Sequence, residues 1–293
     1  MFGGTPPALF FGYDIRRMAA HRSLNLSRSL FLSTRSTFPQ RYIVRTLSTS
    51  SVKYAATQSK KLYDTHIPVP TRQKIMLAVG SAFAALANPL RGDMVATLGE
   101  TTAGNTLENM RKQMLLSDSG RRILRERPLI HTGSIDFPRL RETCKPGTFG
   151  YHYIHWLDQE GVTPDTREPV HFVDNEELAY VMQRYRQVHD FFHVITGLGV
   201  SVEEELALKW FEWAQTSLPM TQLSSMVGPV LLPWDARRRM LVDYIPWALQ
   251  CGANAVPMMT VYFEDHFHTP LDELRRQLNV VPAPVPDNHK TMP

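Results

Sequence analysis

Residues 188–210 read VHDFFHVITGLGVSVEEELALKW, and this stretch predicts the central pair of helices. Five side chains on its N-terminal side recur at steps of four, three, four and four residues: Leu178, Met182, Tyr185, His189 and His193. This spacing places side chains on one face of an α-helix. The pattern therefore predicts a helix whose buried face carries both histidines.

Capping patterns predict where this helix ends and where the next one begins. Asp174 with Glu177 is typical of a capping box at a helix start, and Gly197-Leu198-Gly199 is typical of a helix end. Ser201 with Glu204 is a second capping box, so another helix is expected to begin at once. The short turn favours an antiparallel helix pair.

Four side chains of the ligand type are expected to meet on this pair. At about 100° per residue, His189, Asp190 and His193 share one compact arc of the first helix. Glu205 lies about as far after the turn as His193 lies before it, which brings the two nearly level. Because a carboxylate buried beside imidazoles needs a compensating charge, the pattern predicts a divalent cation. A set of nitrogen and oxygen ligands without thiolate suits Zn²⁺, or Fe²⁺ or Mn²⁺.

Two other interpretations of the motif stay open. The histidines could be ordinary core side chains, with Asp190 and Glu205 solvated. Alternatively, the adjacent His-Asp pair could belong to a metal phosphohydrolase of the HD type, which would also need a histidine and an aspartate from other helices. His171 and Asp243 are the available residues, although no spacing supports them.

The motif and its surroundings resemble the Coq4 family of ubiquinone biosynthesis. HDFFH, eleven further residues and Glu205 match the H-D-x-x-H-(x11)-E zinc motif of that family. Similar blocks follow one another in the same order over about 63–280: LSDSGRRILRERP, GTFG, PDTREPVHFVDNEELAYVMQRYRQVHDFFH, KWFEWAQTSLPM and IPWALQCG. Such an ordered series is more specific than a five-residue motif. The resemblance implies that His189, Asp190, His193 and Glu205 bind zinc.

The resemblance also implies a function, which we state as an expectation. It implies a zinc-dependent carbon–carbon lyase that decarboxylates C1 of a 4-hydroxy-3-methoxy-5-polyprenylbenzoate, with C1 hydroxylation as a coupled option. In this hypothesis the substrate carboxylate binds the metal while C1 is protonated. His152, His155 and Glu204 are the candidate proton donors, and no catalytic residue is assigned. The alternative is a non-catalytic scaffold that binds polyprenyl lipids and organises the ubiquinone biosynthetic complex.

The charge distribution along the chain bears on partners and location. The 293-residue chain has 32 Lys and Arg and 28 Asp and Glu, and 10 and 1 of these fall in residues 1–62. The rest of the chain therefore has 22 basic and 27 acidic residues, so the pI near 9.1 does not indicate nucleic-acid binding. The Arg- and Ser-rich residues 1–54 are typical of a mitochondrial transit peptide. We expect a peripheral protein on the matrix side of the inner membrane, in contact with other ubiquinone-biosynthesis proteins and able to form a homodimer.

The fold predicted for residues 63–280 is a single all-α domain with the metal motif on a helix-turn-helix pair. Helical spacing is also present at 75–87, 91–97, 106–116, 119–124, 149–157, 234–250 and 270–278. No alternating strand pattern and no phosphate-binding glycine loop occurs in the sequence. The Pro-rich residues 281–293 are expected to be a disordered tail.

Overall fold

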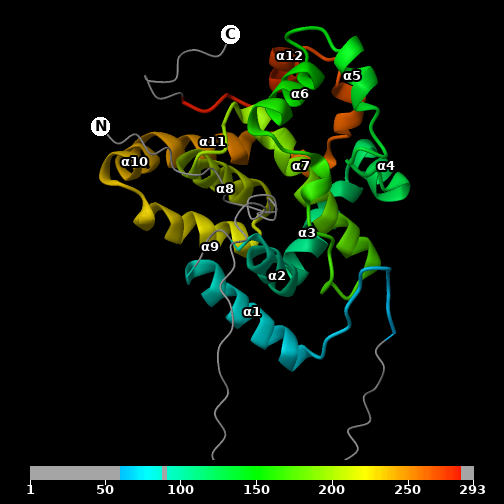
Figure 1. Cartoon of the computed structure of the whole chain (residues 1–293), viewed down its shortest axis with the longest axis vertical. Coiled ribbons are helices and arrows are strands. Elements are labelled where there is room, and N and C mark those ends of the chain that lie inside the picture. Colours follow the sequence, from blue (N-terminus) through cyan, green and yellow to red (C-terminus); the bar gives the residue numbers. More distant parts are fainter. Residues whose placement is uncertain (1–59, 88–90, 285–293) are drawn as a thin grey trace, which may run out of the picture. The chain divides into compact units, whose positions relative to one another are not determined.

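Helices form the secondary structure of residues 60–87 and 91–284, the part of the chain that the computed structural model describes (Figure 1). The α-helices are α1 Thr71–Ala87, α2 Gly92–Thr102, α3 Gly104–Leu115, α4 Asp118–Glu126, α5 Phe137–Thr143, α6 Phe149–Glu160, α7 Glu176–Thr196, α8 Val202–Thr216, α9 Pro219–Val227, α10 Trp234–Arg239, α11 Ile245–Asn254 and α12 Leu271–Gln277. Within these residues no strand occurs, and the only β-pairing is an isolated bridge between Thr148 and Pro270. The all-α prediction is confirmed.

Helix α7 is the central helix of this domain, and α3, α6 and α8 pack against it (Figure 1). From Ala179 to Thr196 every residue except Gln183 is buried. A helix buried on all sides is usually apolar all round. This one carries Arg184, Arg186 and the His189–His193 segment, so its polar groups need partners inside the protein.

The ends of α7 and α8 follow local sequence signals, with one correction. The residue that caps α7 is Asn175, whose Oδ1 accepts a hydrogen bond from the Leu178 N–H at 3.0 Å, and not the predicted Asp174. Gly197 ends α7 with a positive φ of 77°, as expected for a glycine in this position. The predicted Ser201 cap of α8 is confirmed, because its Oγ accepts from the Glu204 N–H, while the Glu204 side chain accepts from the Gly199 N–H and not from the N–H of Ser201.

Aromatic side chains fill the space between α6, α7 and the chain that leads to α12. Phe191 of α7 lies at the centre of this cluster, 5.2 Å from Phe149, 4.7 Å from Tyr153 and 5.1 Å from Phe263 between ring centroids. Phe267 completes the cluster at 6.1 Å. The edge-on and tilted contacts are those that aromatic rings prefer, and they fix α7 against α6 next to the two histidines.

Several predicted helices differ from the observed ones for local reasons. α5 was not predicted, although Asp136 caps it and Pro138 lies in its first turn, because its seven residues include none that is buried. Residues 219–227, where no helix was predicted, form α9. The helix predicted at 234–250 continues to Asn254 through a π-helical turn at Met240–Tyr244, just before Pro246. A proline here removes one N–H donor and crowds the preceding turn.

The termini of the described region bear on the predicted domain limits. Residues 1–54, the predicted transit peptide, lie outside the described residues, as do 285–293 of the predicted tail. Residues 281–284 pack on the domain: the Ala283 N–H donates to the Thr196 carbonyl at 2.8 Å, and Trp247 Nε1 donates to the Val281 carbonyl at 2.9 Å. None of the described helices has the length and apolar character needed to cross a bilayer.

Truncating the central ring of the aromatic cluster should destabilise the fold strongly. Phe191 is 0% exposed, so Phe191→Ala should lower the free energy of unfolding by about 3–5 kcal/mol. Urea denaturation followed by circular dichroism measures this change. The control is Leu116→Ala, at a side chain that is 84% exposed, for which we expect a change within about 0.5 kcal/mol. Equal stability of both variants would show that the cluster does not support the fold.

Candidate metal centre

Three ligand atoms converge where α7 and α8 face each other beyond their turn. His189 and His193 come from adjacent turns of α7, and Glu205 comes from the first turn of α8. The two Nε2 atoms lie 3.2 Å apart, and His193 Nε2 lies 3.3 Å from Glu205 Oε1. One ligand atom from each residue lies within 4.8 Å of the others, and all three side chains are buried. Three of the four predicted residues, His189, His193 and Glu205, therefore lie close together in the structure.

The hydrogen bonds of the other ring nitrogens direct both Nε2 atoms toward this point. His189 Nδ1 donates to Glu212 Oε1 at 2.6 Å, and His193 Nδ1 donates to the Leu198 carbonyl at 3.2 Å. With both protons on Nδ1, each Nε2 presents a lone pair. Two nitrogens bound to one tetrahedral zinc at ~2.0–2.1 Å would be ~3.3 Å apart. The observed separation of 3.2 Å fits such a cation.

The Glu205 carboxylate is buried and incompletely hydrogen-bonded, as a metal ligand would be. It is 3% exposed, and its Oε2 has no hydrogen-bond partner among the described residues. Burial alone would raise its pKa, but the charge and hydrogen bond of His193 outweigh burial and lower the pKa to about 2. A buried carboxylate that stays ionised requires a compensating positive charge.

The two histidines differ in how their surroundings affect protonation. For His189, burial and the neighbouring Lys209 ammonium lower the pKa. For His193, burial also disfavours the charged form, but the carboxylates of Glu205 and Asp190 outweigh it and raise the pKa above the usual value. The neighbouring carboxylates therefore favour the protonated form of His193 when no cation is bound.

Asp190, the fourth predicted ligand, is held by a different partner. Its side chain is 1% exposed and accepts a hydrogen bond from the guanidinium of Arg167, which lies in the segment before α7. The close group of ligand atoms comprises His189, His193 and Glu205. The structure therefore gives Asp190 an ion pair beside the group, and its role as a metal ligand stays a prediction.

A second polar layer lies behind His189, and the sequence reasoning missed it. Glu212 is 0% exposed and binds Tyr185 Oη at 2.8 Å and Lys209 Nζ at 2.5 Å, in addition to His189. The charge of Lys209 and the bond to His189 hold the pKa of Glu212 well below its usual range in spite of burial. The signal in the sequence was the seven-residue step from Glu205 to Glu212, which places both on one face of α8.

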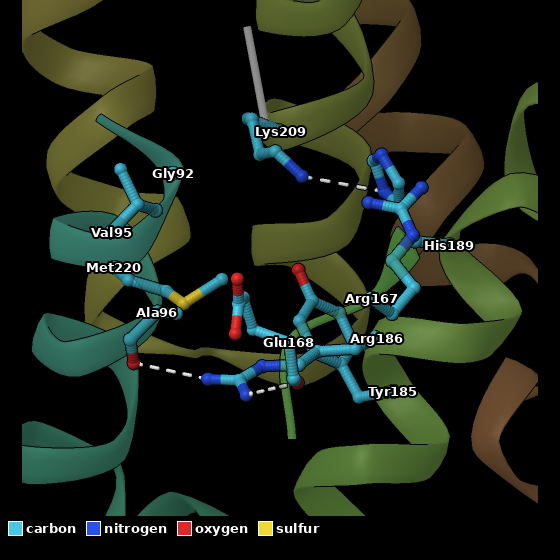
Figure 2. A pocket seen from close by; sticks show the side chains of 10 residues that line it. All are labelled: Gly92, Val95, Ala96, Arg167, Glu168, Tyr185, Arg186, His189, Lys209 and Met220. Carbon is cyan, nitrogen blue, oxygen red and sulfur yellow. Dashed lines mark hydrogen bonds between the residues drawn. The ribbon is translucent and has the colours of Figure 1, made fainter. Parts of the chain in front are cut away.

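A cavity of about 60 Å³ opens beside His189 (Figure 2). Its polar wall contains the side chains of Arg167, Lys209 and Tyr185, and Figure 2 shows Lys209 directed toward His189, with 3.4 Å between Nζ and Nδ1. Val95, Ala96 and Met220 are among the residues of the apolar wall. The cavity therefore places cationic groups and an apolar surface next to a candidate metal ligand.

The predicted proton donors do not line this cavity in the described structure. Glu204 is engaged in the cap of α8 through Ser201 and the Gly199 N–H. His155 is exposed and stacks on Tyr151, and His152 is half-buried. None of the three therefore has a position that supports a catalytic role.

The residues that an HD-type site would need are also engaged elsewhere. His171 Nδ1 donates to the Thr65 carbonyl at 2.8 Å, and its backbone N–H donates to Glu100. Asp243 lines a separate groove with Trp247 of α11. Among the described residues neither joins the histidine pair, so the structure does not support the HD arrangement.

Comparisons with known proteins identify the family of the chain. The sequence profile of the family described as "Coenzyme Q (ubiquinone) biosynthesis protein Coq4" matches residues 63–284. The protein named "Ubiquinone biosynthesis protein COQ4, mitochondrial" from Laccaria bicolor is 48% identical over 84% of this chain and 80% of its own length. The homologue from Bos taurus, also named mitochondrial, is 45% identical over 76% of this chain and 84% of its own length.

A solved structure supports the fold alone. A crystal structure of a protein from Nostoc punctiforme PCC 73102 superposes with a TM-score of 0.56 over 70% of this chain and 97% of that one, at 18% sequence identity. The profile match spans most of the chain, and the identities to full-length relatives are high. The chain is therefore a member of the Coq4 family of coenzyme Q (ubiquinone) biosynthesis proteins.

Proposed function

We propose that the chain binds a divalent cation, Zn²⁺ or otherwise Fe²⁺ or Mn²⁺, through His189, His193 and Glu205, with Asp190 as the fourth ligand or its ion-paired neighbour. The observation that carries this proposal is the buried Glu205 carboxylate between two Nε2 lone pairs, with one oxygen lacking a hydrogen-bond partner among the described residues. When bound, the cation would supply a positive charge that orients and stabilises a carboxylate.

The charges around the site favour an anionic substrate. The buried charges beside the candidate metal centre are the three carboxylates Asp190, Glu205 and Glu212 and the two cations Arg167 and Lys209. Glu168 also lines the cavity, but it is exposed to solvent and is left out of this count. With neutral histidines the set carries one net negative charge, and a divalent cation would change this to one net positive charge. A substrate carboxylate would then neutralise the site, and the low dielectric of the interior strengthens this preference.

We infer that the reaction is C1 decarboxylation of a 4-hydroxy-3-methoxy-5-polyprenylbenzoate in ubiquinone biosynthesis. C1 of the ring accepts a proton from solvent, the bond from C1 to the carboxyl carbon breaks, its electron pair returns to the ring and carbon dioxide leaves. The para-hydroxyl group stabilises the protonated ring by electron donation. Arg167 and Lys209 line the cavity and would hold the carboxylate.

The size of the cavity sets a condition for this reaction. Its volume of about 60 Å³ is smaller than the ~150 Å³ cavity that accommodates benzene in an engineered protein core. An aromatic ring would therefore have to displace wall side chains. Met220 forms part of the wall and has an unbranched, adaptable side chain suited to such movement.

A surface apolar region supports the proposed location and the alternative function. Six apolar side chains between the end of α9 and the π-helical turn are 53–73% exposed: Met226, Val230, Leu231, Trp234, Leu241 and Val242. Arg238 is exposed among them, whereas Arg237 bonds backbone carbonyls and Arg239 pairs with Glu203. We propose that this apolar region contacts the matrix side of the inner membrane or other ubiquinone-biosynthesis proteins. The same region favours the alternative of a non-catalytic polyprenyl-lipid-binding scaffold.

Loss of a ligand should remove metal and product formation together. His193→Ala and Glu205→Ala each remove a converging atom, so the purified variants should lose stoichiometric metal and at least about 100-fold of the rate with a prenylated 4-hydroxybenzoate. Elemental analysis and carbon dioxide release measure the two quantities. His155→Ala, at an exposed histidine, is the control and should keep both. Full turnover by a metal-free variant would contradict the proposal, and a wild-type protein that binds metal but forms no product would favour the scaffold.

Acidification should release the cation. The raised pKa of His193 means that proton and cation compete for Nε2 above the usual histidine value of about 6.5. Apparent Zn²⁺ affinity should be constant above the raised pKa and fall by up to about tenfold per pH unit below it. The shift itself stabilises the metal-free fold at low pH, and this contribution is lost as the pH rises through the raised pKa. Competition with a chromophoric chelator between pH 8 and pH 6 measures the affinity. An unchanged affinity across this range would exclude protonation of His193.

The surface apolar region should bind membranes. Trp234→Ser combined with Leu241→Ser removes two side chains that are 73% and 57% exposed, and we expect at least about tenfold weaker binding to vesicles of phosphatidylcholine and cardiolipin. Flotation of the vesicles measures bound protein. Leu116→Ser changes a leucine of the α3–α4 turn that is even more exposed, at 84%, and should leave binding unaltered. Equal flotation of both variants would place membrane contact elsewhere.

A further inference from the structure

The side chain of Glu212 has no assigned role, yet its position is related to the candidate metal ligands by helix geometry. It follows Glu205 by seven residues on α8, and His189 precedes His193 by four on α7. On an antiparallel pair these steps place His193 opposite Glu205 and His189 opposite Glu212. The first pair and His189 form the close ligand group, and Glu212 lies directly behind His189.

Both carboxylate oxygens of Glu212 accept hydrogen bonds, and each has different donors. Oε1 accepts the Nδ1 proton of His189 at 2.6 Å, while Oε2 accepts from Tyr185 Oη at 2.8 Å and from Lys209 Nζ at 2.5 Å. Three donors from two helices therefore fix the carboxylate in one orientation. The side chain is 0% exposed, so no water competes for these bonds.

This arrangement determines which nitrogen of His189 is available. A carboxylate at Nδ1 holds the proton there, so Nε2 keeps its lone pair and faces His193 and Glu205. Lys209 Nζ lies 3.4 Å from the same Nδ1. An ammonium near this nitrogen favours the opposite tautomer, with the proton on Nε2, because a lone pair on Nδ1 could then accept from Lys209. Glu212 binds both groups and decides the competition.

We propose that Glu212 is a positioning residue that fixes the tautomer and the ring orientation of His189 for cation binding. The part of this inference that concerns cation binding rests on the proposed function. The tautomer of His189 does not depend on it. The rival explanation is that Lys209 and Glu212 form a buried ion pair that only stabilises the fold. Both explanations predict loss of stability in Glu212→Ala, so that variant does not separate them.

Two further variants do separate them. Glu212→Gln combined with Lys209→Met removes both charges of the pair, so no unpaired ammonium is left in the interior. Tyr185→Phe removes one hydrogen bond to Oε2 and leaves the bond to His189 in place. The positioning role predicts 10–100-fold weaker Zn²⁺ binding for the double variant and less than threefold change for Tyr185→Phe. Competition with a chromophoric chelator, with Zn²⁺ alone as the probe, measures both.

The tautomer gives a readout that a purely structural role would not change. In the metal-free wild-type protein, ¹H–¹⁵N correlation spectra of the imidazoles should show His189 protonated at Nδ1, and in Glu212→Gln a mixture of tautomers or the Nε2–H form. Folded double and single variants with wild-type Zn²⁺ affinity and an unchanged His189 tautomer would overturn the proposal. If the double variant fails to fold, the spectrum of Glu212→Gln decides. If the wild-type protein binds no cation, the proposed function fails, whereas the tautomer of His189 still tests the role of Glu212.

Discussion

The main physical constraint in this structure is an ionised carboxylate, Glu205, that is buried beside the imidazoles of His189 and His193. Helix α7 is enclosed on all sides, so each charge on or beside it needs a partner of opposite sign. Four carboxylates have one: the pairs are Arg167–Asp190, Arg184–Glu264, Arg186–Glu100 and Lys209–Glu212. Among the described residues, Glu205 has ion-pair partners only in His189 and His193. A cation at this point would complete the set.

The register of α7 and α8 turns this constraint into a defined site. Residues four apart on one helix and seven apart on the other form two facing levels: His193 faces Glu205, and His189 faces Glu212. Three of these four residues are candidate ligands, and Glu212 binds His189 from behind. The aromatic cluster around Phe191 fixes α7 on its other side. Rigid packing behind the histidines allows the lone pairs to keep their positions without the cation, and this reduces the cost of binding it.

The chemistry proposed for the site depends on more than the helix pair. The cavity beside His189 takes its walls from α2, α9 and the segment before α7 as well as from α7 and α8. An anionic ring with a long apolar substituent would meet cationic side chains and an adaptable methionine there. None of the six exposed apolar side chains near Trp234 lines this cavity, so the proposed membrane contact and the proposed reaction can be tested by separate substitutions.

The α7–α8 helix pair could be predicted from sequence signals between residues close in the chain. The period of α7, the glycine that ends it and the Ser201 cap of α8 depend on residues close in the chain, and they determined the antiparallel pair and the approach of His189, His193 and Glu205. The short helix α5 was not predicted from the sequence, because seven residues without a buried side chain show little hydrophobic periodicity.

The partner of each buried charged side chain depends on the tertiary structure. Asp190 has the spacing of a ligand, but Arg167, 23 residues earlier in the chain, folds back against it. Glu212 carries no motif, yet the three donors Tyr185, His189 and Lys209 meet at its carboxylate. The physical reason is that a helical period specifies which face of a helix a residue occupies, whereas the partner on that face comes from packing between distant segments.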